Sequence, residues 1–183
     1  MNEAVRPMLP LRRPTWLLVL AVMLVFGFYQ EKAKIQLNHY AQVVQQNPEL
    51  CEMTPEMRTV WWNENPQPHR IHYYIMRGTW SGFHGMSLTQ LKGLKWGLSV
   101  AILLIFFALD GLFLKTTGHI ERWPWLVVMY GLAGGVIAVF IAVVPGKSGY
   151  GVAHEFLAFL QSPLPSLFIV LVPSLLERMK VRS

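Results

Sequence analysis

The chain has 183 residues, of which 53% are hydrophobic and only 14% are charged. An average soluble domain carries about 25% charged residues, so this composition excludes an ordinary soluble globule and a disordered chain. The single cysteine, Cys51, excludes an internal disulfide framework. The net charge is +6, but no basic run is interleaved with aromatic residues. We therefore expect the basic residues to contact anionic lipid headgroups, and we expect no binding of nucleic acid.

Four apolar spans predict an all-α, polytopic membrane protein that forms a single membrane domain. They cover residues 14–30, 96–114, 124–145 and 151–176. The first could also be a signal peptide, but no small-x-small cleavage site follows it, which favours an uncleaved anchor. The second follows Ser87 and Gln90, a capping-box pair that predicts a helix from about Leu88. Gly118 is expected to end that helix.

The third span is the most regular of the four. It begins at Pro124, which suits a first helical turn, and it is expected to end at Pro145-Gly146. Gly131 and Gly135 have GxxxG spacing. Small residues on one helix face let another helix approach closely, so these two glycines are the predicted helix-packing residues.

The fourth span is interrupted near its middle. The interruption consists of Gln161, Ser162, Pro163 and Pro165. Because each proline removes a backbone donor and clashes with the preceding turn, we expect a broken helix with pieces at about 152–161 and 165–178. The side chains of Gln161 and Ser162 could satisfy the carbonyls that the break leaves free. Discontinuous helices mark binding sites in transporters, which keeps a transport role open.

The orientation follows from the basic residues. Four spans place both termini on one side, and basic residues are densest in the short segments on that side. This pattern predicts cytoplasmic termini and an extracytoplasmic loop over residues 31–87. Within that loop the first helix should continue to about Asn47, and Thr54-Pro55 should open a second, short helix. Residues 69–76 fit a short strand or a helix equally well.

Asp110 is the only aspartate in the chain and lies within an apolar span. A charged group at membrane depth is costly, so its presence is a hypothesis of function. The alternative is structural. Lys115 follows five residues later, which would place Asp110 near the cytoplasmic interface, where its carboxylate could meet water or a basic neighbour.

A second group of candidates belongs to the extracytoplasmic side. His154 and Glu155 open the fourth span, and the loop contributes the histidines His69, His72 and His84. Together they could form a metal site or an acid–base pair. The alternative is that they bond headgroups or water at the interface.

Cys51 lies in the same loop. We expect a small buried apolar residue there, and a bridge to a partner or a nucleophile with a loop histidine are the alternatives. The sequence contains no P-loop, GxGxxG, GxSxG, CxxC or HExxH motif. No cofactor is therefore predicted, and catalysis is less favoured than a non-catalytic role.

The chain also resembles a known group of proteins in its layout. The segment EKAKIQLNHY follows the first span, and EFLAFLQSPLP opens the last. This arrangement is similar to that of small accessory membrane proteins encoded beside exosortases, the membrane cysteine transpeptidases of bacterial surface sorting. The resemblance implies a helper in the inner membrane of a bacterium, without catalysis of its own. It assigns no functional residue, and the chain lacks the membrane-embedded Cys, Arg and His triad of an exosortase.

These observations predict an integral membrane accessory or assembly subunit, with a surface-protein sorting or export system as the machinery that it would serve. Its expected partners are the lipid bilayer and either a larger membrane protein or a second copy of the chain. Two alternatives stay open. One is a small membrane enzyme with a site at His154 and Glu155, and the other is a minimal transporter subunit that uses the broken fourth helix.

Overall fold

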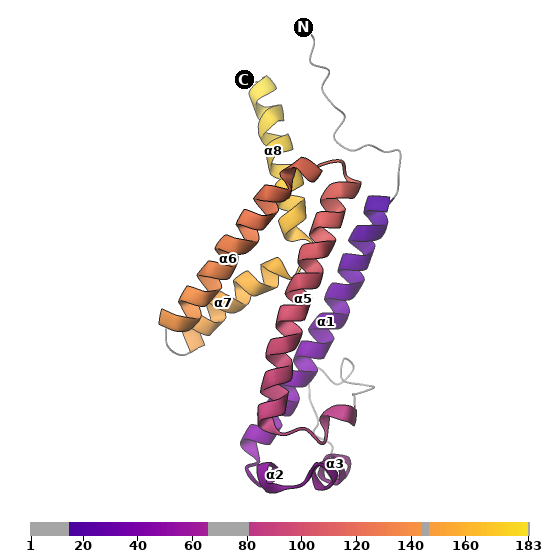
Figure 1. Ribbon diagram of the computed structural model, residues 1–183, viewed down its shortest axis with the longest axis vertical. Helices are drawn as coiled ribbons and strands as arrows, with labels where there is room; N and C mark the ends of the chain where they lie inside the picture. The colour runs from indigo at the N-terminus through magenta and orange to yellow at the C-terminus, as the bar shows by residue number, and fades with distance from the viewer. Residues whose placement is uncertain (1–14, 66–80, 144–146, 183) are drawn as a thin grey trace. The chain divides into compact units, whose positions relative to one another are not determined.

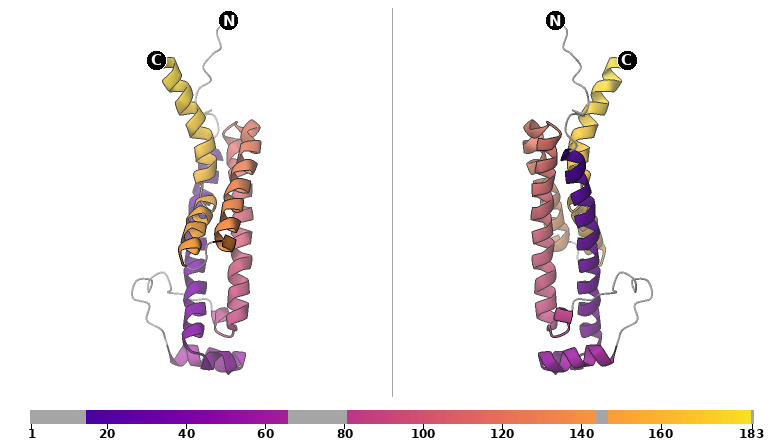
Figure 2. Two further views of the ribbon diagram at one scale, coloured as in Figure 1. Left: turned by 90° about the vertical axis from the view of Figure 1, so that its left-hand side faces the viewer. Right: turned by 90° about the vertical axis from the view of Figure 1, so that its right-hand side faces the viewer.

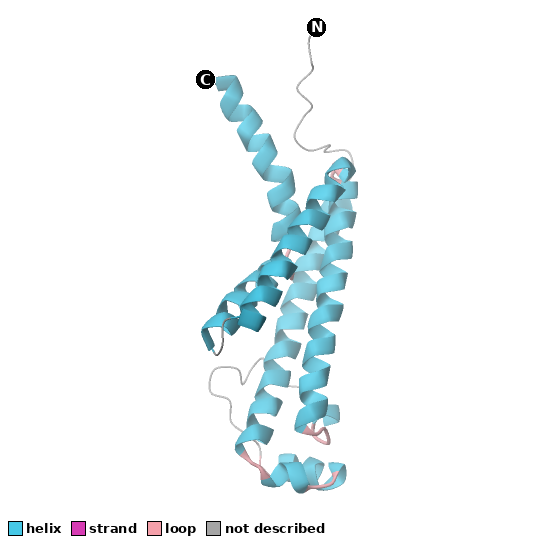
Figure 3. Cartoon of the chain, turned by 60° about the vertical axis from the view of Figure 1, so that its left-hand side comes forward, coloured by secondary structure: helices cyan, strands magenta, loops and turns pink. Residues whose placement is uncertain are grey.

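The computed structural model describes residues 15–65, 81–143 and 147–182. All secondary structure in these ranges is helical (Figure 3), which confirms the all-α prediction. The elements in chain order are α1 (Thr15–Gln46), α2 (Glu49–Glu52), α3 (Pro55–Glu64), η1 (Ser81–Phe83), α5 (Leu88–Thr116), η2 (Ile120–Arg122), α6 (Trp123–Val143), α7 (Lys147–Leu160) and α8 (Leu164–Arg182). Figure 1 labels the α-helices.

Three helices are long and apolar enough to cross a membrane, namely α1, α5 and the helix over Ile120–Phe140. A fourth crossing exists if the bent pair Val152–Leu160 and Leu164–Pro173 counts as one span, and the bend between its two parts is 74°. This is the architecture of a helical polytopic membrane protein. The break in the fourth span is confirmed, and its pieces are α7 and α8.

The ends of α5 are fixed by the two signals that the sequence contains. The Ser87 backbone N–H donates to the Gln90 side chain at 2.8 Å, and the Gln90 N–H donates to the Ser87 hydroxyl at 3.3 Å, which confirms the capping box. At the other end Gly118 has a φ of 79°. The His119 N–H donates to the Leu114 carbonyl at 2.8 Å, as in a Schellman motif.

The chain divides into two compact units, and α1 and α5 each contribute to both. The first unit, called the helical unit here, consists of Met1–Gly27 and Ile102–Ser183. Within it, α6 and α7 lie side by side (Figures 1 and 2). Its fully buried residues include Met23, Phe106 and Leu160. The rings of Phe26 and Phe106 pack with their centroids 5.5 Å apart.

The second unit, called the cap unit here, consists of Phe28–Ala101. In it α1 continues to Gln46, as predicted, and α2 and α3 lie crosswise at its end (Figure 2). Thr54 caps α3 by accepting a hydrogen bond from the Met57 N–H at 3.3 Å, and Pro55 occupies the first turn. The buried core of the cap unit is formed by Leu37, Tyr40, Val43, Val44, Leu50, Trp62, Phe83 and Leu91.

Cys51 is exposed, so the prediction of a buried residue is wrong. The reason is local. The helix α2 is a single turn of 4 residues that buries Leu50. The side chain of the next residue along a helix points to another face, so Cys51 turns away from the core.

Candidate functional site

The break between α7 and α8 is held by a polar side chain from the break itself. Pro163 and Pro165 lack the N–H groups that would continue the helix. The Ser162 hydroxyl donates to the Phe159 carbonyl at 2.6 Å and accepts a hydrogen bond from the Leu164 N–H at 3.3 Å. The local role predicted for Ser162 is confirmed. Gln161 is buried at the same place.

Asp110 of α5 is connected to this break through Tyr130. Its side chain has 0% exposure. The Tyr130 hydroxyl of α6 lies 2.7 Å from Asp110 Oδ2 and 2.8 Å from the Leu160 carbonyl at the end of α7. Ser166, in the first turn of α8, lies against the same carboxylate. The cluster of Asp110, Tyr130, Ser166 and the Leu160 carbonyl therefore joins α5, α6, α7 and α8, and we call it the break cluster.

The alternative that Asp110 meets water or a basic neighbour is wrong, because its side chain is fully buried and bonds to the half-buried Tyr130 hydroxyl. A hydroxyl has one hydrogen, so Tyr130 can donate to the carboxylate or to the Leu160 carbonyl, but not to both at once. Asp110 Oδ1 has no hydrogen-bond partner among the described residues. The break cluster thus joins four helices through the Asp110 carboxylate and the Leu160 carbonyl.

Arg122 compensates for a second proline. In a helix the carbonyl of Ile169 would accept from the N–H of residue 173, but that residue is Pro173, which lies inside α8. Arg122 Nη1 donates to the Ile169 carbonyl at 2.8 Å and to the Val170 carbonyl at 3.3 Å. A side chain 47 residues away thus replaces the missing donor and lets α8 continue through Pro173.

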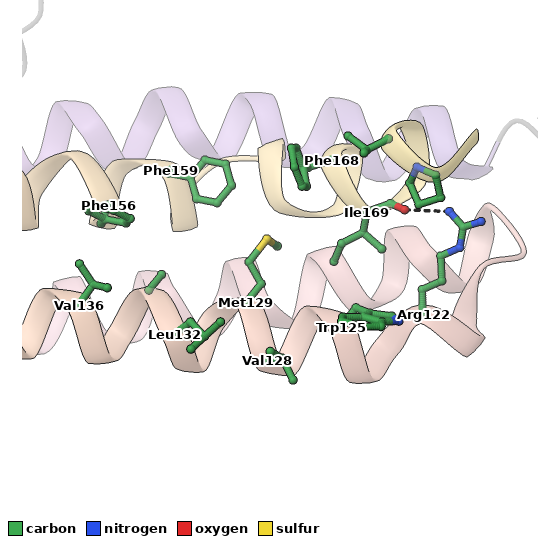
Figure 4. A pocket seen from close by; sticks show the side chains of 13 residues that line it. Arg122, Trp125, Val128, Met129, Leu132, Val136, Phe156, Phe159, Phe168 and Ile169 are labelled. Atoms are coloured by element: carbon green, nitrogen blue, oxygen red, sulfur yellow. Dashed lines mark hydrogen bonds between the residues drawn. The ribbon is translucent and has the colours of Figure 1, made fainter. Parts of the chain in front are cut away.

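An apolar groove begins at this arginine. It has a volume of about 650 Å³ and is lined by residues of η2, α6, α7 and α8 (Figure 4). Arg122 and Trp125 lie at one end, and Val136 and Phe156 lie at the other. Between them Phe159 and Phe168 line the opposite wall from Met129 and Leu132. Among the described residues that line the groove, Arg122 is the only charged one.

The cap unit contains an aromatic cluster around Tyr40 and His84. The Tyr40 hydroxyl and His84 Nε2 are 3.0 Å apart. The indole of Trp62 stacks on the His84 ring with the planes inclined by 16°, and it packs edge-on against Tyr40 at 4.6 Å. Burial of the imidazole lowers the pKa of His84 below its ordinary value.

Arg58 holds the backbone around this cluster. It is 6% exposed and lies on α3. Its Nη1 donates to the carbonyls of Met53 at 2.9 Å and Leu50 at 3.2 Å, and its Nε donates to the carbonyl of Gly85 at 3.1 Å. One guanidinium therefore fastens α2, the turn after α2 and the segment after η1.

The predicted acid–base and metal residues are distributed over both units. His154 and Glu155 are exposed on α7, in the helical unit. His84 lies in the cap unit, whereas His69 and His72 lie outside the described residues. No group of three or more His, Cys, Asp or Glu side chains that could hold a metal exists in the part of the chain that the structure describes. A site that includes His69 and His72 stays a prediction.

The two glycines of the GxxxG pattern lie on an open face of α6. A Cβ atom added at Gly131 or Gly135 would meet nothing within 4 Å. Within the helical unit α6 instead buries Ala133, which is 7% exposed. The end of the third span at Pro145-Gly146 lies outside the described residues.

Sequence reasoning missed Tyr130, Arg122 and Arg58. A signal for Tyr130 was present, because it is the only residue with a hydroxyl group in the third span, residues 124–145. A buried carboxylate in one span needs such a partner in another. For Arg122 the sequence contained half of a signal, because Pro173 leaves the Ile169 carbonyl without its helical donor, but nothing indicates which side chain replaces that donor. Arg58 had no comparable signal, because it bonds to carbonyls of segments that contain no such proline.

No protein family, no curated protein and no solved structure matches this chain.

Proposed function

We propose that this protein is a non-catalytic subunit of a membrane assembly and that it binds a larger membrane protein through one face of α6. The observation that carries the proposal is a stripe of small, exposed residues on that helix. It consists of Gly131, Gly135, Ala138 and Ala142, all of which are exposed. Their spacing of four, three and four residues places them on one helix face.

This face suits a helix of another chain. Within a membrane, association depends on close packing, and small residues let two helix backbones approach each other. Space is available, because Cβ atoms at Gly131 and Gly135 would meet nothing within 4 Å. The helix is also the least buried of the three candidate spans, with 11% of its apolar window buried against 22% and 33% for the other two.

The polar residues of the helical unit support a role without catalysis. Asp110 and Tyr130 form a hydrogen bond at the break between α7 and α8. Arg122 donates to the Ile169 carbonyl that Pro173 leaves free inside α8. Each of these groups stabilises an interrupted helix, which is a structural task.

The proposed setting is the inner membrane of a bacterium, with both termini in the cytoplasm and residues 31–87 outside. The density of basic residues in the short segments supports this orientation. In it the cap unit would present α2 and α3 to a substrate or partner beyond the membrane. The similarity in layout to exosortase-associated proteins makes a surface-protein sorting or export system the first class of partner to test.

The experiment is affinity purification of the tagged full chain after crosslinking in native membranes. The wild-type chain should enrich one larger membrane protein. The double variant Gly131→Leu and Gly135→Leu should lose it, because two large side chains separate the helices. Gly97→Leu is the matched control, since a Cβ there also meets nothing within 4 Å. A wild-type chain that enriches no protein, or a double variant that retains the partner, would contradict the proposal.

A second candidate function is a minimal transport subunit. A buried carboxylate at a bent helix pair favours it, because discontinuous helices form the binding sites of many transporters. Asp110→Asn preserves the size of the side chain and removes its charge. Proton- or ion-coupled flux into vesicles should fall in this variant, and unchanged flux would dismiss the transport role.

A further inference from the structure

We propose that the groove beside Arg122 binds one anionic phospholipid, with an acyl chain between α6 and the α7–α8 pair and the phosphate on the Arg122 guanidinium. This site is separate from the small-residue stripe of α6, and it does not depend on the proposed function. Figure 4 shows the arrangement of the lining side chains.

The dimensions of the groove favour a hydrocarbon chain over a helix. Along η2 and α6 it extends from Arg122 to Val136, which is about 21 Å at 1.5 Å per residue. Its volume of about 650 Å³ is distributed over that length, so the groove is long and narrow. A helix with side chains is at least about 10 Å wide, which favours a broad groove over a long and narrow one. An extended acyl chain is much narrower and fits.

The lining of the groove matches a phospholipid in its distribution of apolar and charged groups. Twelve of the 13 lining residues are apolar or aromatic, and the one cation is at an end of the groove. A phospholipid likewise has long apolar chains and a charge at one end. The exposed indole of Trp125 lies at the same end as Arg122. Tryptophan favours the headgroup level of a membrane, so this end is the place for the phosphate.

Arg122 keeps donors for such a ligand. A guanidinium has five N–H donors. Nη1 bonds to the Ile169 and Val170 carbonyls, and these are the hydrogen bonds of the side chain within the described residues. The Nε and Nη2 donors remain, and a half-buried guanidinium can bind phosphate through two parallel hydrogen bonds. The two carbonyl bonds fix the side chain in place, which reduces the entropy lost when the lipid binds.

The test is native mass spectrometry of the full chain in detergent, titrated with dioleoylphosphatidylglycerol or dioleoylphosphatidylcholine. These lipids have the same acyl chains, and only the first has a net negative charge. The wild-type chain should bind one phosphatidylglycerol about tenfold more tightly than phosphatidylcholine, because the charge-assisted bonds add to the burial of the chain. The water-soluble headgroup, glycerophosphoglycerol, should not displace the lipid at equal concentration.

Two variants distinguish the contribution of the acyl chain to binding from that of the headgroup. Met129→Trp should fill the groove and weaken the binding of both lipids at least tenfold, whereas Leu104→Trp, at an exposed site on α5 outside the lining, should bind like the wild type. Arg122→Gln should remove the preference for phosphatidylglycerol and leave the affinity for phosphatidylcholine unchanged.

Several results would overturn the proposal. Equal wild-type affinity for the two lipids would do so, and so would a preference that survives in Arg122→Gln. A groove occupied by a second copy would give a lipid-free dimer that Met129→Trp dissociates, which also contradicts it. If Arg122→Gln does not fold, the wild-type preference and the pair Met129→Trp and Leu104→Trp still decide the matter.

Discussion

An arginine bonds to backbone carbonyls in each of the two units, and the two arginines differ in their burial and in the kind of carbonyl they bond to. Arg58 in the cap unit is 6% exposed and bonds to three carbonyls of short, irregular segments. Arg122 in the helical unit is half-buried and bonds to carbonyls inside α8, one of which Pro173 leaves free. A side chain thus supplies the donor that the backbone lacks in both units. Burial limits Arg58 to this role, whereas Arg122 remains accessible to a ligand.

The largest expected effect is on the free energy of unfolding, when the buried Arg58 is compared with an exposed lysine. Arg58→Ala should reduce the free energy of unfolding by about 3 kcal/mol, because it leaves buried carbonyls without donors. Lys92→Ala, at an exposed position of α5, should change it by less than about 0.5 kcal/mol. The measurement is unfolding of the full chain in mixed micelles with increasing dodecyl sulfate, followed by tryptophan fluorescence. Equal effects of the two substitutions would contradict the role of Arg58.

The next effect tests packing in the helical unit. A Cβ atom at Gly111 would overlap the ring of Trp123, whereas a Cβ atom at Gly93 in the same helix would meet nothing within 4 Å. Gly111→Ala should therefore destabilise the protein by about 2 kcal/mol through overpacking. Gly93→Ala should be neutral or stabilise it by up to about 1 kcal/mol, because alanine favours the helix. The same unfolding assay gives both values. A stabilising Gly111→Ala would show that Trp123 of α6 does not pack against Gly111 of α5.

A smaller effect measures the break cluster. Tyr130→Phe removes only the hydroxyl between Asp110 and the Leu160 carbonyl, and the expected loss is about 1 kcal/mol. Tyr29→Phe removes a hydroxyl from an exposed tyrosine of α1 and should have no measurable effect. The two unfolding curves should differ in midpoint with equal slopes. Coincident curves would mean that Tyr130 does not stabilise the break.

The smallest effect is a pH dependence of the cap unit. Because the pKa of His84 is lowered in the folded chain, the unfolded chain binds a proton more readily. The contribution of His84 to stability is thus complete above its unfolded value, near 6.5, and declines as the pH falls from there towards the folded value. Unfolding measured at pH 7.5 and pH 5 should show this loss in the wild type. His84→Gln should reduce the difference, and an unchanged difference would exclude His84 as its source.

The sequence predicted the helices well where the signals were local. The pair Ser87 and Gln90, the dipeptide Thr54-Pro55 and Gly118 each act within one turn of their own position, so their effect can be read without a fold. The prolines at 163 and 165 likewise predicted the break. Cys51 was predicted wrongly, because which residue of a single helical turn is buried depends on the neighbouring elements.

The contacts of the candidate site were harder to predict. Asp110 and Tyr130 are 20 residues apart, and Arg122 and Ile169 are 47 apart. Only folding brings them together. The sequence can indicate that a buried carboxylate needs a hydroxyl partner and that Pro173 leaves the Ile169 carbonyl without a donor, but it does not indicate which distant side chain meets that need.

The most direct test of the account is the side of the membrane on which two positions lie. Cys51, the single native cysteine, is exposed in the cap unit. Lys115→Cys in a Cys51→Ser background places an exposed thiol at the other end of α5. If α5 crosses the membrane in the proposed orientation, a membrane-impermeant maleimide added to spheroplasts should label Cys51 directly and should label the Lys115→Cys chain only after permeabilisation. Labelling of both positions from the same side would contradict a membrane-spanning α5.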